Sequence, residues 1–172
     1  TYSFGRPSNG GGSNGYPCKS YGQSRIYASF YYGDFSNLDK RRDVTVAVTA
    51  NSGTCSEAII DFTPGNMKKG GLGNNKLDES RMAVPYTLAQ RRSGVNICQM
   101  RMADVILMLA EVDAVLGFEV DARTEFTKVR SRAFSTADQT TMVTDYINGK
   151  SGNDLIDAIL DERKFEFAGE GL

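Results

Sequence analysis

The fold of this chain is decided by residues 97–117, ICQMRMADVILMLAEVDAVLG. Apolar side chains recur there at steps of three and four residues, which predicts a long helix with a continuous apolar face. We expect this face to be buried, and it comprises Met102, Val105, Leu109, Val112 and Leu116. Further apolar residues widen it, namely Ile106, Leu107, Ala110 and Val115. A membrane span is excluded because charged residues interrupt the stretch, and charges inside a bilayer are costly.

Two further helical patterns follow, at residues 121–134 and 154–169. Gly117 is a typical residue just beyond a helix end, and Asp121 is a suitable N-cap for the next helix. Because the link is short, the first two helices are expected to pack as an antiparallel hairpin. The sequence therefore predicts a helical segment over residues 97–172.

Residues 1–96 are predicted to form a loop-rich segment with short strands. The clearest strand is DVTVAVT at residues 43–49, where valine alternates with threonine and alanine. A turn over residues 51–54 and a return strand over residues 58–62 complete a predicted hairpin. The segments 1–96 and 97–172 are expected to belong to one domain that is incomplete at both ends, because the sequence lacks a starting Met and stops directly after a helix.

The composition excludes several classes of protein. The net charge of −1 offers no basic surface for nucleic acid. The chain contains no histidine, so Ser-His-Asp and Cys-His catalytic arrangements and His-ligated metals are excluded within it. The three cysteines lack CxxC spacing, which disfavours zinc and leaves one disulfide or three free thiols open. We expect no cofactor, no metal and no nucleic-acid partner.

Three clusters of side chains each allow two interpretations. Seven aromatic residues between residues 16 and 35 suit either a stacking platform for sugar rings or anchors for long loops, and anchoring is favoured for any single ring. The run DKRRD at residues 39–43 suits either an anion site or a salt-bridged turn that caps the strand, and the turn is favoured. Glu162 and Glu166 are spaced for acid–base work or metal binding, but a structural charge network is favoured because basic partners lie beside them.

Three motifs occur in a fixed order in the second half: RMADVILMLAEVDAVLG, FTKVRSRAF and IDAILDERKFEFAGEG. Together they resemble the C-terminal part of the SusD/RagB family, whose pattern is roughly R-x-A-D-V-x-L-M-x-A-E-A, N-x-V-R-x-R-A and I-x-x-E-R-x-x-E-[LF]-x-x-E-G. The resemblance spans about residues 21–172, and Thr127 departs from it where the family usually has Asn. The resemblance implies that the shared motif residues are scaffold: Arg101, Asp104, Glu111, Arg130, Arg132, Glu162, Arg163 and Glu166.

The resemblance implies a mostly α fold, with tetratricopeptide-like helical pairs and a loop-rich segment containing short β-strands. It also implies a non-catalytic protein that binds glycan nutrients, either polysaccharide or oligosaccharide, at the cell surface. Such a protein delivers its cargo to a SusC-type TonB-dependent transporter of the outer membrane. The family's members are surface-exposed outer-membrane lipoproteins, and the lipid anchor is expected outside this chain.

Two alternatives stay open beside glycan binding. The same scaffold could bind peptides or glycopeptides, or the chain could be a helical-repeat protein–protein adaptor. Ligand contacts in the family lie in variable loops, so no family position carries over to this chain. The candidate ligand-binding residues are aromatic side chains beside Gly-rich loops, namely Tyr2, Tyr16 and Tyr21.

Overall fold

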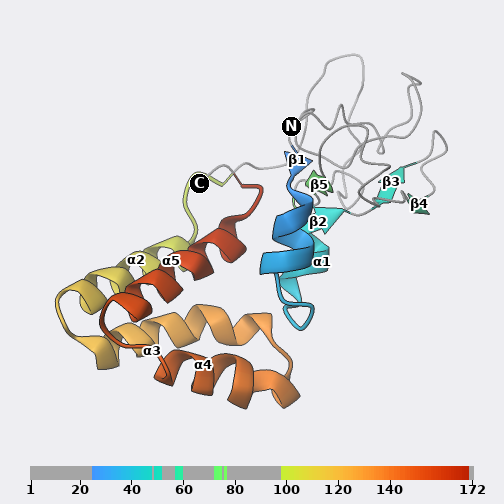
Figure 1. Cartoon of the computed structure of the whole chain (residues 1–172). Coiled ribbons are helices and arrows are strands. Elements are labelled where there is room, and N and C mark those ends of the chain that lie inside the picture. Colours follow the sequence, from blue (N-terminus) through green and yellow to red (C-terminus); the bar gives the residue numbers. More distant parts are fainter. Residues whose placement is uncertain are drawn as a thin grey trace. The chain divides into compact units, whose positions relative to one another are not determined.

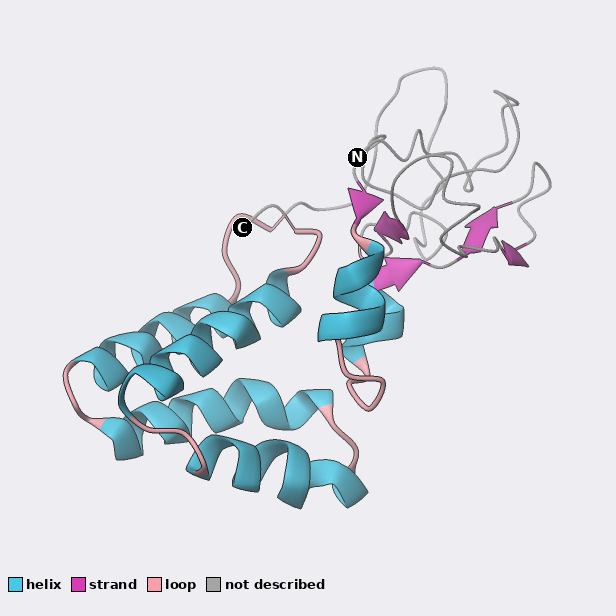
Figure 2. Ribbon diagram, viewed as in Figure 1, coloured by secondary structure: helices cyan, strands magenta, loops and turns pink. Residues whose placement is uncertain are grey.

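Most of the described part of the chain is helical (Figures 1 and 2). The computed structural model describes residues 25–47, 49–51, 57–59, 72–74, 76 and 98–170. The chain divides into two compact units. The N-terminal unit comprises Thr1–Ser36 and Arg42–Ile97, and the helical unit comprises Asn37–Arg41 and Cys98–Leu172.

The three helices predicted from the sequence are all present in the helical unit. They are α2 (Met102–Val115), α3 (Glu119–Arg130) and α5 (Gly152–Phe167). Between α3 and α5 the chain forms the 3-10 turns η4 (Ser131–Ala133) and η5 (Thr136–Asp138), the π-helical η6 (Thr140–Asp145) and the short α4 (Tyr146–Asn148). Both α3 and α5 begin two residues earlier than predicted.

A tight link joins α2 to α3. Gly117 has a φ of 85°, in the left-handed region that favours glycine. The next amide, of Phe118, donates to the carbonyl of Asp113 at 2.8 Å, which is the C-cap geometry that a left-handed glycine allows. The chain then packs α3 back against α2 as the predicted antiparallel hairpin (Figure 1). The prediction that Asp121 caps α3 is wrong, because the helix starts at Glu119 and Asp121 lies inside its first turn.

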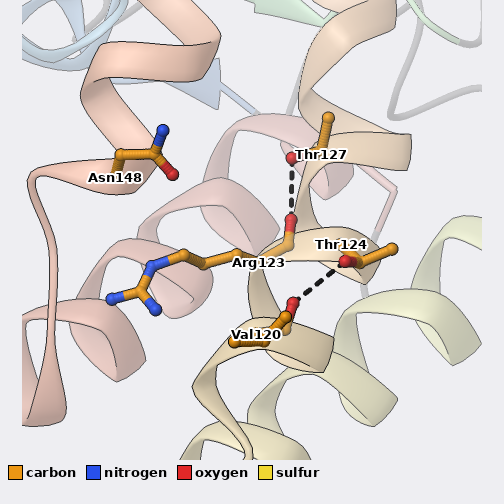
Figure 3. Close-up of a pocket in the computed structure, with 5 residues that line it drawn as sticks. All are labelled: Val120, Arg123, Thr124, Thr127 and Asn148. Carbon is orange, nitrogen blue, oxygen red and sulfur yellow. Dashed lines mark hydrogen bonds between the residues drawn. The ribbon is translucent and has the colours of Figure 1, made fainter.

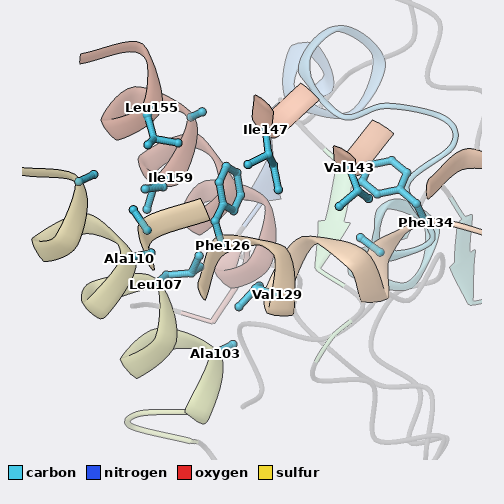
Figure 4. Packing of buried hydrophobic residues seen from close by; sticks show 14 of the residues in the cluster. Ala103, Leu107, Ala110, Phe126, Val129, Phe134, Val143, Ile147, Leu155 and Ile159 are labelled. Carbon is cyan, nitrogen blue, oxygen red and sulfur yellow. The ribbon is translucent and has the colours of Figure 1, made fainter. Parts of the chain in front are cut away.

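The core of the helical unit forms where α2, α3 and α5 meet (Figure 4). Phe126 of α3 is fully buried, and its ring lies 6.5 Å from the Tyr146 ring in an edge-to-face arrangement. Leu107, Leu155 and Ile159 are also fully buried. Burying each such side chain contributes roughly 1.5–3 kcal/mol, so this cluster dominates the stability of the unit.

The prediction of which face of α2 is buried is wrong for its central residues. Leu109 of the predicted face is 48% exposed. The other residues at the centre of that face are exposed to a similar or greater extent: Met102, Val105, Val112 and Leu116. Leu107 and Ala110, which were predicted to widen that face, are buried. The other buried residues of α2 were not predicted: Ala103, Asp104 and Ala114. Alanine side chains let α3 and α5 approach closely beside Leu107, whereas most of the other large apolar residues of α2 stay exposed. None of the helices within the described ranges has the length and apolarity needed to cross a bilayer.

Short antiparallel strands occur in the N-terminal unit. One sheet has the order β1-β5-β2, formed by Arg25–Ile26, Leu72–Asn74 and Val46–Ala47. Its register pairs Arg25 with Gly73 and Val46 with Asn74. A second sheet pairs β3 (Thr49–Asn51) antiparallel with β4 (Glu57–Ile59), so a hairpin forms near the predicted place, but its first strand begins at Thr49 and includes Asn51 of the predicted turn.

The predicted strand at residues 43–49 is mostly wrong. Residues Arg41–Thr45 form the helical turn α1, and only Val46–Ala47 and then Thr49–Asn51 are extended. Asp39 stabilises the helical start, because its Oδ1 accepts a hydrogen bond from the backbone amide of Arg41 at 2.9 Å. Local alternation of valine and threonine favours a strand, but this cap and the ion pairs of Arg41 outweigh it.

Candidate functional site

A fully buried carboxylate lies on α5. The side chain of Glu162 is 0% exposed, and both of its oxygens face arginines. Arg130 Nη1 donates to Oε2 at 2.7 Å, and Arg41 Nη1 donates to Oε1 at 2.6 Å. Arg130 is fixed in turn, since its Nε donates to the carbonyl of Met142 and its guanidinium lies 3.8 Å from the centre of the Tyr146 ring. Each oxygen of the buried charge is thus matched by a donor.

A second buried carboxylate, Glu166, lies one turn further along α5. It accepts hydrogen bonds from Arg41 Nη1 at 2.8 Å, Arg101 Nη1 at 2.9 Å and Arg132 Nη2 at 3.1 Å. Burial alone would raise the pKa of Glu166, but the hydrogen bonds from Arg41 and Arg101 outweigh burial and lower that pKa below its usual value. Arg101 also binds both oxygens of Glu170, at 2.7 and 2.9 Å, so it links the start of α2 to the end of α5.

The short segment Asn37–Arg41 completes this charge network from outside α2, α3 and α5. Arg41 binds Asp39 through Nε and Nη2, with Nη2 to Oδ2 at 2.6 Å. Burial disfavours the charged guanidinium of Arg41, yet its hydrogen bonds to Asp39 and the two glutamates raise its pKa overall. The adjacent amide of Lys40 donates to the carbonyl of Ala133 at 2.9 Å. The salt-bridged turn favoured at residues 39–43 is therefore present, but its arginine reaches α5.

This network leaves its carboxylates unsuited to acid–base catalysis. A general acid must hold a proton near the working pH, whereas Glu166 has a lowered pKa and Glu162 is enclosed by two guanidinium groups. Neither side chain faces solvent, so the pair offers no open cleft for a substrate. Within the described ranges, no group of three or more Cys, Asp or Glu residues is arranged to hold a metal ion. The network instead joins α5 to Arg41, Arg101 and Arg130 through ion pairs.

The remaining predicted motif residues lie on α2 and α5. Arg163 Nη2 lies 2.7 Å from Asp104 Oδ1, an ion pair between α5 and α2 whose angles are not those of a hydrogen bond. Glu111 is a half-buried residue on α2. Cys98 is a free, exposed thiol, while Cys18 and Cys55 lie outside the described residues.

A shallow hollow of about 440 Å³ lies beside α3 (Figure 3). Four of its lining residues come from α3 and the fifth, Asn148, ends α4. Thr124 and Thr127 donate their hydroxyl hydrogens to carbonyls of α3 itself. Arg123 Nη2 donates to Glu119 and to the carbonyl of Lys150. Because these donors are committed to the protein, the hollow is a poor candidate for tight ligand binding.

An ordered aromatic cluster lies in the N-terminal unit. The Tyr31 hydroxyl donates to Asp43 Oδ1 at 2.6 Å, and the Arg42 guanidinium lies 4.7 Å from the centre of the Tyr31 ring. Burial raises the pKa of Tyr31 to about 12, with the hydrogen bond to Asp43 adding to the effect, so the hydroxyl stays a donor. The hydrogen bond from Arg42 lowers the pKa of Asp43. Tyr32 stands perpendicular to Tyr31, with ring centres 4.8 Å apart.

The candidate ligand residues Tyr2, Tyr16 and Tyr21 lie outside the described residues. Arg41 was not predicted to be a partner of α5. No local signal could have paired it with Glu162 and Glu166, because 121 and 125 residues separate them.

Comparison with known protein families gives a match over almost the whole chain. Residues 5–172 match the model of the SusD family. No curated protein and no solved structure matches the chain. SusD family proteins are non-catalytic surface lipoproteins of the outer membrane, with a nutrient-binding role associated with a SusC-type partner. Because the family model matches nearly every residue, the chain belongs to the SusD family.

Proposed function

We propose that this protein binds glycans, as polysaccharide or oligosaccharide, at the cell surface and delivers them to a SusC-type TonB-dependent transporter. The observation that carries the proposal is the family match over residues 5–172. The charge network supports it, because Glu162 and Glu166, the pair spaced for acid–base work, are held by arginines. The protein would therefore present its cargo unchanged.

Within this proposal the helical unit is the scaffold. We assign α2 and α3 to one tetratricopeptide-like pair, since they form a tightly linked antiparallel hairpin. The third helix, α5, begins the next pair. The arginine–glutamate network joins α2, α3 and α5, so it fixes the geometry of the scaffold rather than contacting cargo.

The proposed ligand contacts are Tyr2, Tyr16 and Tyr21. Their aromatic faces would stack on the apolar CH surface of a sugar ring. Their place beside Gly-rich stretches supports this role, because binding residues concentrate on loops that a rigid scaffold positions.

The test is binding of the purified chain to soluble starch, galactomannan, arabinoxylan and a casein peptide mixture. Affinity electrophoresis would screen the panel, and calorimetry would give the Kd for each hit. We expect binding to one glycan class, weakened in Tyr16→Ala and Tyr21→Ala. The variants Tyr16→Phe and Tyr21→Phe keep the ring and serve as controls. Binding to peptides without binding to any glycan would instead make the protein a peptide or glycopeptide binder.

A helical-repeat adaptor is the second candidate, and one observation favours it. Every exposed residue of α2 is apolar, and an exposed apolar face is typical of protein–protein contact. This candidate predicts tight association with the membrane barrel partner and no binding to any member of the panel. Pull-down of the SusC-type transporter by the chain, weakened in Val112→Lys, together with no binding to any member of the panel, would favour the adaptor; binding to the panel would favour cargo binding.

A further inference from the structure

An exposed apolar surface lies at the link between α2 and α3, which Figure 1 shows at one end of the helical unit. Its side chains belong to a short run of the chain that ends α2 and begins α3. Their exposed fractions lie between 52% and 76%, and we call them together the hairpin tip: Val112, Val115, Leu116, Phe118 and Val120. Large apolar side chains gathered on an exposed surface are typical of a protein–protein contact.

The backbone of the hairpin tip is fixed before any partner arrives. Gly117 has a φ of 85°, and the Phe118 amide donates to the Asp113 carbonyl at 2.8 Å. At the start of α3, Glu119 Oε1 accepts a hydrogen bond from the Gly152 amide at 2.7 Å, which ties this helix to the start of α5. Little backbone entropy would therefore be lost when a partner covers the hairpin tip.

The charged residues beside the hairpin tip are all acidic. Between Met102 and Ala122 the sequence has no Lys or Arg, and its acidic residues are Asp104, Glu111, Asp113, Glu119 and Asp121. Two of these are neutralised, because Asp104 pairs with Arg163 and Glu119 pairs with Arg123. Within the part of the chain that the structure describes, the other three carboxylates have no ion pair. The hairpin tip therefore has a negatively charged edge.

Helix stability does not account for this arrangement. The last turn of α2 contains Asp113 and has no basic residue. The carbonyl end of a helix favours cations and disfavours carboxylates, so Asp113 lies where it costs stability. The exposed side chains of Val115 and Leu116 likewise gain nothing from burial in this chain. Both features are explained if a partner covers the apolar residues and supplies positive charge to the acidic edge.

The charge also distinguishes among the possible occupants. A second copy of the chain would bring the same unpaired carboxylates of both copies together, and like charges across an interface are costly. A membrane surface of anionic lipid would repel the same edge. A protein surface with an apolar recess and Lys or Arg side chains around it matches both the hairpin tip and its edge.

We propose that the hairpin tip is the surface through which this protein docks on its SusC-type transporter, and that the transporter offers an apolar recess edged by basic side chains. The inference rests on the proposed delivery of cargo to such a transporter and adds the contact surface and its chemistry. Phe118 is the central anchor, because it is the aromatic residue of the hairpin tip and a few large side chains carry most of the binding energy of an interface.

The test measures association of the purified chain with the SusC-type transporter, held in detergent micelles on a biosensor surface. Phe118→Ser should raise the Kd roughly tenfold or more, as expected for the loss of an interface anchor. Phe118 is the N-cap residue of α3 and serine is a favourable N-cap, so this change should keep the helix folded. The matched control is Leu160→Ser, which removes a 44% exposed apolar side chain of α5 and should stay within about twofold of the wild type.

A second pair of variants tests the acidic edge. Asp113→Asn should slow association about two- to fivefold at low ionic strength and leave dissociation nearly unchanged. The difference should fade at about 0.5 M salt, where charges are screened over a few ångströms. Asp157→Asn, at an exposed position of α5, is the control and should change neither rate. Each variant should bind glycan as the wild type does, and circular dichroism would verify its fold.

The other outcomes contradict the inference in different ways. Transporter binding that Phe118→Ser leaves unchanged would refute the docking surface and spare the proposed function. Association that does not depend on ionic strength would refute the basic edge of the partner. A dimer seen by light scattering, or binding to phosphatidylcholine vesicles, that is lost in Phe118→Ser would assign the hairpin tip to a second copy or to lipid. A wild-type chain that does not bind the transporter would refute both this surface and the proposed delivery.

Discussion

Arg41 and Glu162 form an ion pair across 121 residues of sequence, with Arg41 Nη1 2.6 Å from Glu162 Oε1. The carboxylate is fully buried, so the guanidinium is needed to offset the cost of removing that charge from water. Arg41 also binds Glu166 and Asp39. Arg41 thus provides a partner for both buried glutamates of α5.

Replacing Arg41 should destabilise the helical unit. Arg41→Met leaves Glu162 with Arg130 alone and removes one donor from Glu166, so we expect a loss of about 2–4 kcal/mol in the free energy of unfolding. Urea titration followed by circular dichroism at 222 nm would measure it. The control is Arg42→Met, whose partner Asp43 is exposed and whose loss should cost below about 1 kcal/mol. Equal losses in the two variants would contradict a special role for Arg41.

Stability should depend on pH through Glu166. Its pKa is lowered in the folded protein, so the unfolded chain binds more protons as the pH falls through its ordinary value near 4.5. The stabilisation is therefore present above that pH and is lost as the pH falls through the folded pKa. Glu166→Gln cannot titrate, so its unfolding free energy should change less steeply between pH 5 and about pH 3. Parallel pH profiles for the two proteins would refute this contribution.

Two leucines of α2 provide a matched test of which face is buried. Leu107 is fully buried and Leu109 is half exposed. Leu107→Ala should lower the unfolding free energy by about 2–5 kcal/mol, because it leaves a cavity among α3 and α5. Leu109→Ala should change it by less than about 1 kcal/mol, because it removes mostly exposed surface. Thermal and urea unfolding of the two variants would decide. A larger loss for Leu109→Ala would restore the face predicted from periodicity.

Replacing Gly117 should lower the free energy of unfolding because of its backbone conformation alone. Its φ of 85° disfavours side chains, although a Cβ there would meet no atom within 4 Å. Gly117→Ala should therefore cost roughly 1–2 kcal/mol, the strain of a left-handed residue. Gly33→Ala is the control, because that position also has open space and lacks a positive φ. It should be neutral or slightly stabilising in the same urea titration. Similar changes at both glycines would argue against strain at the α2–α3 link.

The helices of the second half could be predicted from the sequence, and so could the turn at Gly117. Local periodicity and a helix-ending glycine are signals carried by neighbouring residues, so they need no knowledge of the rest of the fold. The absence of histidine likewise excluded His-dependent catalysis from composition alone.

Only the tertiary structure decided which side of α2 is buried, whether residues 41–45 are helix or strand, and where Arg41 binds. α2 carries apolar residues on several sides, so its pattern allows more than one buried face, and the close approach of α3 and α5 over alanines selects one. The alternation at residues 43–49 is overruled by the Asp39 cap and by ion pairs to a distant helix. These choices depend on long-range contacts, which a sequence pattern of a few residues does not encode.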